Sequence, residues 1–353
     1  MIIRISMIFL TILAIFFAFV FGIGYYLSGP KHTGPGTEHF TGEVFLNPGN
    51  AKAKGFGDVL QWMLKRKQGP WVEDTLSQPG PKPADVVTEG AKITFVNHST
   101  FLIQTRGANI LTDPIWSERT SPFSWAGPKR IRRPGLRFED LPRIDLVLIS
   151  HNHYDHLDIQ TLRGLKERDN PQVVSPLGVS ALLKENGIHS VSELDWWQSL
   201  VVKGVEVAAV PAQHFSGRGL FDRDATLWCG YTLKLDSGFL YFAGDTGYND
   251  QTFKEIGARF APIEVALVPI GAYKPEWFMS PIHCSPAEAL QIHDDLQSKV
   301  SIGIHFGTFP LADDGQHEPV EELQRAIREK GMSADVFRVL KEGIPFDWPH
   351  RLP

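Results

Sequence analysis

A six-residue segment of the chain holds three histidines and one aspartate: His151, His153, Asp155 and His156. Neutral imidazole nitrogens and carboxylate oxygens are ligands that suit Zn²⁺. Side chains this close in sequence cannot all reach one tetrahedral ion, so the spacing favours two neighbouring ions. The alternative is a solvated polar loop with chance histidines, which is disfavoured because similar residues recur farther along the chain.

Three more ligand-type residues each follow an apolar run. His214 comes after VEVAAVPA, Asp245 comes after FLYFAG, and His305 lies at the end of SIGIH. A single histidine at a strand end is by default a structural residue, but four strand ends that each deliver a ligand favour one shared site. Five histidines and two aspartates would give each ion three ligands and one shared carboxylate. Positions would remain open for water, as a catalytic site requires.

The elements that must position these residues alternate between strands and helices. The run from Ile144 to Ile149 is continuously apolar, which is typical of a strand covered on both faces. Further β-rich runs lie at 91–112 and near 205, 227, 239, 265 and 301. Helical patterns span Ser285 to Leu296, with Pro286 after the cap residue, and Val320 to Lys330. This alternation predicts an α/β layered fold, with the ligands in loops at the carboxyl ends of the strands.

The N-terminus has a different composition. No charged residue occurs between Ile5 and Leu27, a run long enough to cross a bilayer as a helix. We expect residues 1–30 to be an uncleaved membrane anchor, the alternative being a cleaved secretory signal. Arg4 on the short side favours a cytoplasmic N-terminus. The protein would then be a single-pass inner-membrane protein with its catalytic domain on the outer, periplasmic side.

The rest of the chain divides into a tether and one large domain. Residues 31–55 are rich in glycine, proline and polar residues, so they are predicted to be a tether. The domain would cover residues 56–353 and begin with a short amphipathic helix from Phe56 to Lys67. A net charge of −5 and an isoelectric point near 6.2 argue against a nucleic-acid partner. Two cysteines, Cys229 and Cys284, exclude a disulfide framework.

Longer strings around the ligands carry a family resemblance. The ligand segments read SHNHYDHLD, PAQHF, FAGDTGY and IHFGTF, and the chain also contains LTDPIW, GPKRIRR, ELDWW and PIGAYKPEWFM. The chain resembles the metallo-β-lactamase superfamily and, within it, the phospholipases D that hydrolyse N-acyl phosphatidylethanolamine. H-x-H-x-D-H alone marks only the superfamily, whereas the longer strings are more specific. The similarity runs from about Asn47 to Val339.

The resemblance implies an αβ/βα sandwich of the metallo-β-lactamase type. The apolar N-terminal run would add one transmembrane helix before it, which is a departure from the best-known animal members. The resemblance also implies two zinc ions. One ion would be held by His151, His153 and His214, the other by Asp155, His156 and His305, with Asp245 bridging them. The reaction would be hydrolysis of a phosphodiester bond in a membrane phospholipid, giving phosphatidic acid and an N-acylethanolamine. Asp155 would orient the attacking water and take its proton. Relatives of this kind also suggest a homodimer.

Two residues outside the ligand set are candidates for substrate contacts. The resemblance suggests that His283, in a loop before a helix, lines the active site and donates a hydrogen bond to the phosphate or the leaving group. A hydrogen bond from this loop to the core is an equally good interpretation. Tyr273, in the nearby aromatic stretch, is predicted to contact substrate.

Two further features have structural interpretations beside functional ones. Asp113 precedes a proline, so it is expected either to support a ligand or simply to form a turn. Lys129, Arg130, Arg132 and Arg133 form a basic run that would be a solvated loop or a contact for anionic lipid headgroups.

Two other functions fit the same residues. One is a zinc-dependent lactonase or other carboxylic-ester hydrolase, which would leave phosphodiesters intact. The other is a non-enzymatic, membrane-tethered metal-binding protein, which the complete set of seven ligand-type residues disfavours.

Overall fold

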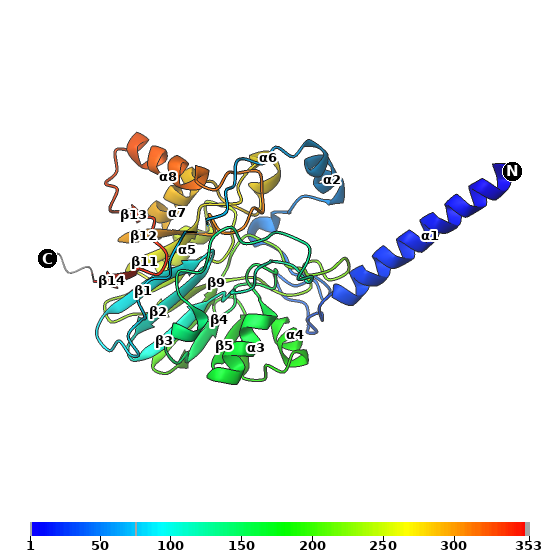
Figure 1. Ribbon diagram of the computed structural model, residues 1–353. Helices are drawn as coiled ribbons and strands as arrows, with labels where there is room; N and C mark the ends of the chain where they lie inside the picture. Colours follow the sequence, from blue (N-terminus) through cyan, green and yellow to red (C-terminus); the bar gives the residue numbers. More distant parts are fainter. Residues whose placement is uncertain (1, 75, 350–353) are drawn as a thin grey trace.

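The computed structural model describes residues 2–74 and 76–349. Within these residues, two seven-stranded β-sheets pack face to face, helices cover their outer faces, and one long helix leaves the body (Figure 1). The first sheet has the order β14-β1-β2-β3-β4-β5-β6. Its strands are β1 (Ala91–Asn97), β2 (Thr100–Thr105), β3 (Ala108–Thr112), β4 (Leu146–Leu148), β5 (Gln172–Pro176), β6 (Val191–Leu194) and β14 (Pro345–Trp348).

The second sheet has the order β13-β12-β11-β10-β9-β8-β7. Its strands are β7 (Ser199–Val202), β8 (Val205–Val210), β9 (Gly230–Lys234), β10 (Phe239–Phe242), β11 (Ile263–Pro269), β12 (Val300–Ile304) and β13 (Phe337–Arg338). The main core lies between the sheets, where Phe95 and Phe101 of the first belong to one buried cluster with Val207 and Tyr231 of the second. The Tyr231 hydroxyl donates to the carbonyl oxygen of Ile149 and so joins the two layers.

Helices form the two outer layers. On the first sheet lie α3 (Ile159–Arg168) and α4 (Val179–Glu185), whose Leu162 and Val179 pack with Leu111 and Val147 of the strands. The second sheet is covered by α5 (Thr252–Arg259), α7 (Pro286–Leu296) and α8 (Glu318–Glu329). The expected start of α7 is confirmed, since Ser285 caps it and Glu288 completes a capping box. The expected αβ/βα sandwich is also confirmed.

Strand direction brings many chain segments to one edge of the sandwich. β3, β4 and β5 run parallel, and β10, β11 and β12 run parallel. Two antiparallel steps make β1 parallel to β3, and two more make β8 parallel to β10. The loops after β1, β3, β4, β8, β10 and β12 therefore meet at the carboxyl edge, where ligands bind in α/β folds.

The N-terminal segment consists of helix α1 (Ile2–Leu27) followed by packed chain. Residues Met7–Leu27 of α1 are long and apolar enough to cross a membrane, and a signal sequence would have the same properties. Residues 31–55, predicted to be a tether, instead pack against the domain. Phe40 and Phe45 are each only 2% exposed and lie in a cluster with Trp228. Gly34 and Gly42 of this segment lie in bends, and Pro48–Asn50 form a short 3₁₀ helix. Helix α2 (Phe56–Lys65) comes next in the chain, and it contacts the short helix α6 (Glu276–Met279) on the same side of the molecule.

Candidate metal centre

The predicted ligands converge at the carboxyl edge in two groups. In the first group, Nε2 of His151 lies 2.9 Å from Nδ1 of His153, and Nε2 of His214 lies 3.2 Å from the same atom. His151 and His153 come from the loop after β4, and His214 comes from the loop after β8. Three ring nitrogens from two sheets thus face one point.

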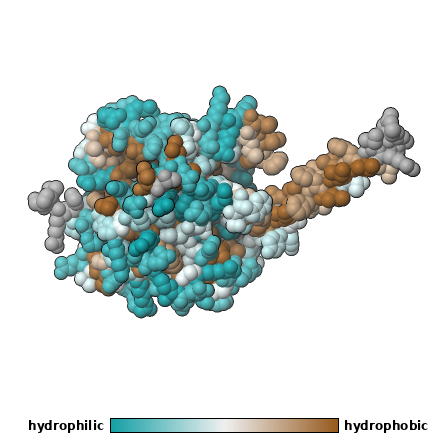
Figure 2. All heavy atoms as spheres, viewed as in Figure 1, coloured by the Kyte–Doolittle hydropathy of each residue, from teal (hydrophilic) through white to brown (hydrophobic). Residues whose placement is uncertain are grey.

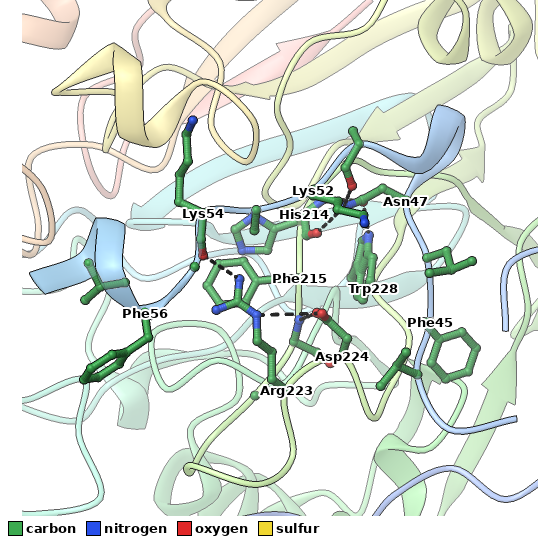
Figure 3. Close-up of a pocket in the computed structure, with 18 of the residues that line it drawn as sticks. Phe45, Asn47, Lys52, Lys54, Phe56, His214, Phe215, Arg223, Asp224 and Trp228 are labelled. Atoms are coloured by element: carbon green, nitrogen blue, oxygen red, sulfur yellow. Dashed lines mark hydrogen bonds and ion pairs between the residues drawn. The ribbon is translucent and has the colours of Figure 1, made fainter. Parts of the chain in front are cut away.

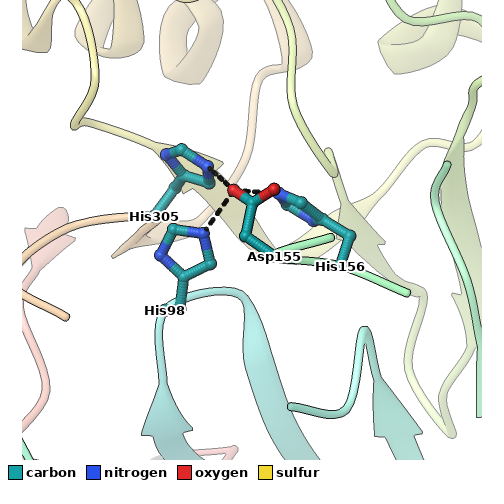
Figure 4. Close-up of side chains that lie close together, drawn as sticks. All are labelled: His98, Asp155, His156 and His305. Atoms are coloured by element: carbon teal, nitrogen blue, oxygen red, sulfur yellow. Dashed lines mark hydrogen bonds and ion pairs between the residues drawn. The ribbon is translucent and has the colours of Figure 1, made fainter. Parts of the chain in front are cut away.

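The second group gathers around the carboxylate of Asp155 (Figure 4). Its Oδ2 lies 3.3 Å from Nε2 of His156, 3.4 Å from Nε2 of His305 and 3.0 Å from Nε2 of His98. His98 was not among the ligands predicted from the sequence. It follows β1 directly, just as His305 follows β12, so its position after an apolar strand was the signal that could have found it.

Asp245 lies between the two groups. Its Oδ2 is 3.0 Å from Nε2 of His305 and 3.2 Å from Nε2 of His156, both in the second group. The same oxygen is 3.8 Å from Nε2 of His214, in the first group. One carboxylate therefore reaches both groups, which is the geometry expected of a shared ligand.

The hydrogen bonds of the first group fit metal binding. His151 donates from Nδ1 to the hydroxyl oxygen of Ser150 at 2.9 Å, and His214 donates from Nδ1 to the carbonyl oxygen of Ile282 at 2.9 Å. Each bond fixes the tautomer and leaves a bare Nε2 directed at the group. The site thus presents unprotonated nitrogens, as a cation requires.

Asp113 orients His156 in the second group. It is fully buried after β3, accepts from Nδ1 of His156 at 2.7 Å, and is itself held by the backbone N–H and hydroxyl of Ser150. Nε2 of His156 is then free to face Asp155 and Asp245. Of the two expectations for Asp113, the structure shows the supporting role.

Several buried atoms of this cluster have no hydrogen-bond partner among the described residues. They include Nε2 of His156, Nε2 of His305 and Oδ1 of Asp245. Orphaned buried polar atoms are costly, and metal ions bound here would satisfy them. Backbone strain points the same way, because His98, Asp113 and His305 all have positive φ values, of 48°, 33° and 60°. Such conformations gather at functional sites.

The two groups differ in protonation. In the first group, burial lowers the pKa of His153 to about 4 and holds the pKa values of His151 and His214 well below the usual range. In the second group, burial opposes charge on His305, but Asp245 and Asp155 raise its pKa to about 9. Without metal at neutral pH, the histidines of the first group are neutral, whereas His305 in the second group is protonated.

The second group also carries opposite charges at close range. Burial alone would lower the pKa of His156, but Asp245, Asp155 and Asp113 raise it well above the usual value. Burial would likewise raise the pKa of Asp155 and Asp245, but the His156 imidazolium holds both well below it. A cation binding here would take the place of those protons.

A cavity of about 290 Å³ opens onto the cluster. His153, Asp155, His214, Asp245, His283 and His305 line its polar side, and its other walls are largely apolar, with Trp62, Phe278, Met279, Ile282 and Leu311. Nδ1 of His283 lies 3.8 Å from Oδ2 of Asp245 and has no hydrogen-bond partner in the part of the chain that the structure describes. Burial lowers the pKa of His283 to about 4, so the ring is neutral and can donate one hydrogen bond.

Two sequence predictions find less support in the geometry. Tyr273 is buried, at 1% exposure, and is not among the residues that line this cavity. Its contact with substrate therefore stays a prediction. The basic run is structural in part, because Arg130 is buried and donates to backbone carbonyls, and Arg132 pairs with Glu342.

Comparison with known proteins agrees with this geometry. Residues 108–306 match a family described as the beta-lactamase superfamily domain. The chain is 39% identical over 250 residues to N-acyl-phosphatidylethanolamine-hydrolyzing phospholipase D 1 of Caenorhabditis elegans, covering 67% of this chain and 70% of that protein. It is 38% identical over 246 residues to the mitochondrial N-acyl-phosphatidylethanolamine-hydrolyzing phospholipase D of Saccharomyces cerevisiae, covering 67% of this chain and 52% of the relative.

Among solved structures, the fold is similar to Igni18, a metallo hydrolase from the archaeon Ignicoccus hospitalis. That match has a TM-score of 0.56 at 24% identity and covers 74% of this chain and 99% of the other. The relatives named as hydrolases favour an enzyme over a metal-binding scaffold. The chain belongs to the family described as the beta-lactamase superfamily domain, and it is a metal-dependent hydrolase of the metallo-β-lactamase superfamily.

Proposed function

We propose that the protein hydrolyses the phosphodiester bond of N-acyl phosphatidylethanolamine, with two zinc ions, releasing phosphatidic acid and an N-acylethanolamine. The observation that carries this proposal is the pair of His/Asp groups at the floor of a largely apolar cavity. The 39% identity to a phospholipase D named for this substrate supports the choice of bond. A set of histidine and carboxylate ligands suits zinc.

The ions would lower the pKa of a bound water and neutralise charge on the phosphoryl oxygens. Residues of the chain would orient the water and contact the substrate. Asp155 lines the cavity, so its carboxylate can orient the attacking water and accept its proton. His283 faces the cavity as a neutral ring and would donate a hydrogen bond to a phosphoryl or leaving-group oxygen. The apolar walls formed by Phe278, Met279 and Leu311 would exclude bulk water and contact lipid chains.

The cellular setting is also part of the proposal. We take α1 to span the inner membrane once, with the catalytic domain on the periplasmic side. The 21 residues Met7–Leu27 of α1 are mostly apolar, and only 6% of this span is buried. A membrane anchor would keep the enzyme at the surface where its lipid substrate lies. A homodimer is proposed from the resemblance and would be tested by sedimentation.

The alternative chemistry is that of a lactonase or other carboxylic-ester hydrolase on the same metal centre. Purified full-length protein should be incubated separately with N-acyl phosphatidylethanolamine and with a panel of lactones, each with and without chelator. Mass spectrometry should detect phosphatidic acid and N-acylethanolamine only when metal is present. Opened lactones with an intact phosphodiester would overturn the proposal in favour of the alternative.

A further inference from the structure

The C-terminal end of α1 and the two residues after it are hydrogen-bonded to the loop 217–222. The N–H of Gly29 donates to Oδ2 of Asp222 at 2.8 Å, and the N–H of Phe221 donates to the Ser28 hydroxyl at 3.0 Å. Two glycines allow this close approach. A Cβ on Gly219 would lie 2.5 Å from the carbonyl oxygen of Gly24, and a Cβ on Gly24 would lie 2.3 Å from Leu220. The helix therefore meets the domain through a built contact.

The same loop is tied to the metal centre. Asp222 is 1% exposed and also accepts from the backbone N–H groups of Arg218 and Gly219. The Arg218 guanidinium donates to the carbonyl oxygens of Asn152 and Leu157 at 2.8 and 3.1 Å. Those two residues lie within and just after the ligand segment 151–156. A short chain of hydrogen bonds thus sets the position of α1 relative to the metal ligands.

Large apolar side chains are exposed beside the base of α1 and on α2. Leu220 is 54% exposed and Phe221 is 43% exposed in the loop that holds the helix. On α2, Phe56, Met63 and Leu64 are 81%, 63% and 80% exposed. In Figure 1, α2 projects from the side of the body on which α1 leaves it, and Figure 2 shows hydrophobic surface over both helices. Exposed apolar groups gathered in this way mark contact surfaces.

A cavity of about 680 Å³ lies between these two sets of apolar residues. Figure 3 shows it bounded by the segment through Lys54 and Phe56 on one side and by Arg223 and Asp224 on the other. Its lining includes Leu220. It adjoins the metal-centre cavity, with which it shares Lys54, Phe215 and Arg223 among other residues. Two cations therefore stand where an anionic headgroup would pass toward the metal ligands.

We propose that the last turn of α1, Leu220, Phe221 and the exposed face of α2 form one surface that contacts the lipid bilayer, and that a phospholipid enters the 680 Å³ cavity directly from that bilayer. The use as a substrate path rests on the proposed function, whereas the contact with the bilayer does not. The bilayer is the occupant favoured by continuity, because Leu220 and Phe221 pack against the base of a helix that is itself apolar enough to lie in lipid.

The contact can be measured independently of activity. Both native cysteines are buried, at 1% and 0% exposure, so a single introduced cysteine on the surface would carry a fluorophore selectively. Leu64→Cys and Phe221→Cys place the label on the proposed surface. Val201→Cys is the matched control, because Val201 is 67% exposed and lies on β7, at the end of the strands away from the metal centre.

The labelled full-length proteins would be reconstituted in phosphatidylcholine vesicles that contain a nitroxide-bearing lipid. We expect several-fold stronger quenching at positions 64 and 221 than at position 201. Equal quenching at all three positions would overturn the proposed surface, whatever substrate the enzyme has.

The substrate path is tested separately, by comparing hydrolysis rates in vesicles and in detergent. The double variant Met63→Ser, Leu64→Ser should hydrolyse N-acyl phosphatidylethanolamine in vesicles several-fold more slowly than the native chain, with no change on the same lipid dispersed in detergent. Equal rates in vesicles would overturn entry from the bilayer. If the native chain hydrolyses the lipid in neither form, the proposed function fails while the quenching result still decides the surface.

Discussion

Nε2 of His98 lies 3.0 Å from Oδ2 of Asp155, although 57 positions separate the two residues in the sequence. Burial lowers the pKa of His98 to about 3, so its ring is neutral and has one N–H to donate. That N–H faces the carboxylate, and the bond fixes the orientation of Asp155 within the second ligand group. His98 is thus a positioning residue for a ligand that also faces the cavity.

Replacing His98 should weaken the binding of the ion in the second group more than the binding of the ion in the first group. His98→Ala removes the hydrogen bond to Asp155, and losses of about 10–100-fold in metal affinity are typical for such supporting partners. We expect metal analysis after dialysis to show close to one ion retained. His98→Gln keeps an N–H donor and should lie between His98→Ala and the native chain. Full occupancy and rate in His98→Ala would show that the bond has no positioning role.

Asp113→Asn should disturb His156 in a similar way. The amide retains an acceptor oxygen for Ser150 but offers a donor where Nδ1 of His156 needs an acceptor, so the tautomer that frees Nε2 loses its support. The expected result is about 10–100-fold weaker binding of the second ion, measured by competition with a chromogenic chelator. Asp335→Asn, at an exposed position whose side chain is 80% accessible, is the control and should bind like the native chain.

Reloading the metal-free protein should release protons from the second group only. The pKa of His305 is raised to about 9 by Asp245 and Asp155 against the effect of burial, so the ring is protonated below that pH and must lose its proton to bind metal. In the first group, the pKa of His153 is lowered to about 4, so its ring is already free at neutral pH.

Affinity for the second ion should therefore rise between pH 6 and pH 8, while affinity for the first should change little. Calorimetric titrations in buffers of different ionisation enthalpy measure the proton count for each step. Proton release that is equal at both steps would contradict the assigned difference between the groups.

Two truncations should distinguish the role of the anchor, residues 1–30, from that of the packed segment, residues 31–55. A chain that begins at residue 31 keeps Phe40, Phe45 and Asn47, and should be soluble, folded and active on detergent-dispersed substrate. A chain that begins at residue 56 loses two buried phenylalanines, each worth about 3–5 kcal/mol. It also loses the bonds from Asn47 to both backbone groups of His214. Thermal unfolding should show the second chain strongly destabilised, and equal melting temperatures would contradict the packing described for residues 31–55.

Much of the fold follows from local sequence patterns. The runs at 91–97, 205–210, 239–242 and 300–304 are apolar and β-rich, and each forms a strand close to the expected bounds. The seven predicted ligands meet at one edge because they follow strands of a common direction. The segment 31–55 shows where local patterns mislead. Its composition is that of a linker, but burial of Phe40 and Phe45 depends on contacts with Trp228, far away in the chain.

The site was predictable to the extent that it depends on strand ends. His98 was overlooked because it sits in the tight turn between β1 and β2, where a single polar residue is expected for reasons of turn formation alone. The support of His156 by Asp113 depends on the parallel pairing of β3 with β4, which no local pattern specifies. Tertiary pairing therefore decides which polar residues act on the ligands.

The most direct test of the two-metal centre is the substitution Asp245→Asn, followed by metal analysis and by the rate on detergent-dispersed N-acyl phosphatidylethanolamine. The Asp245 carboxylate reaches His156 and His305 on one side and His214 on the other, and a neutral amide is a poor replacement for a shared anionic ligand. We expect occupancy well below two ions and a rate lower by about 10³-fold, which corresponds to roughly 4 kcal/mol of transition-state stabilisation. Retention of both ions with a rate within a few-fold of the native chain would contradict the shared role of Asp245 and the two-metal mechanism with it.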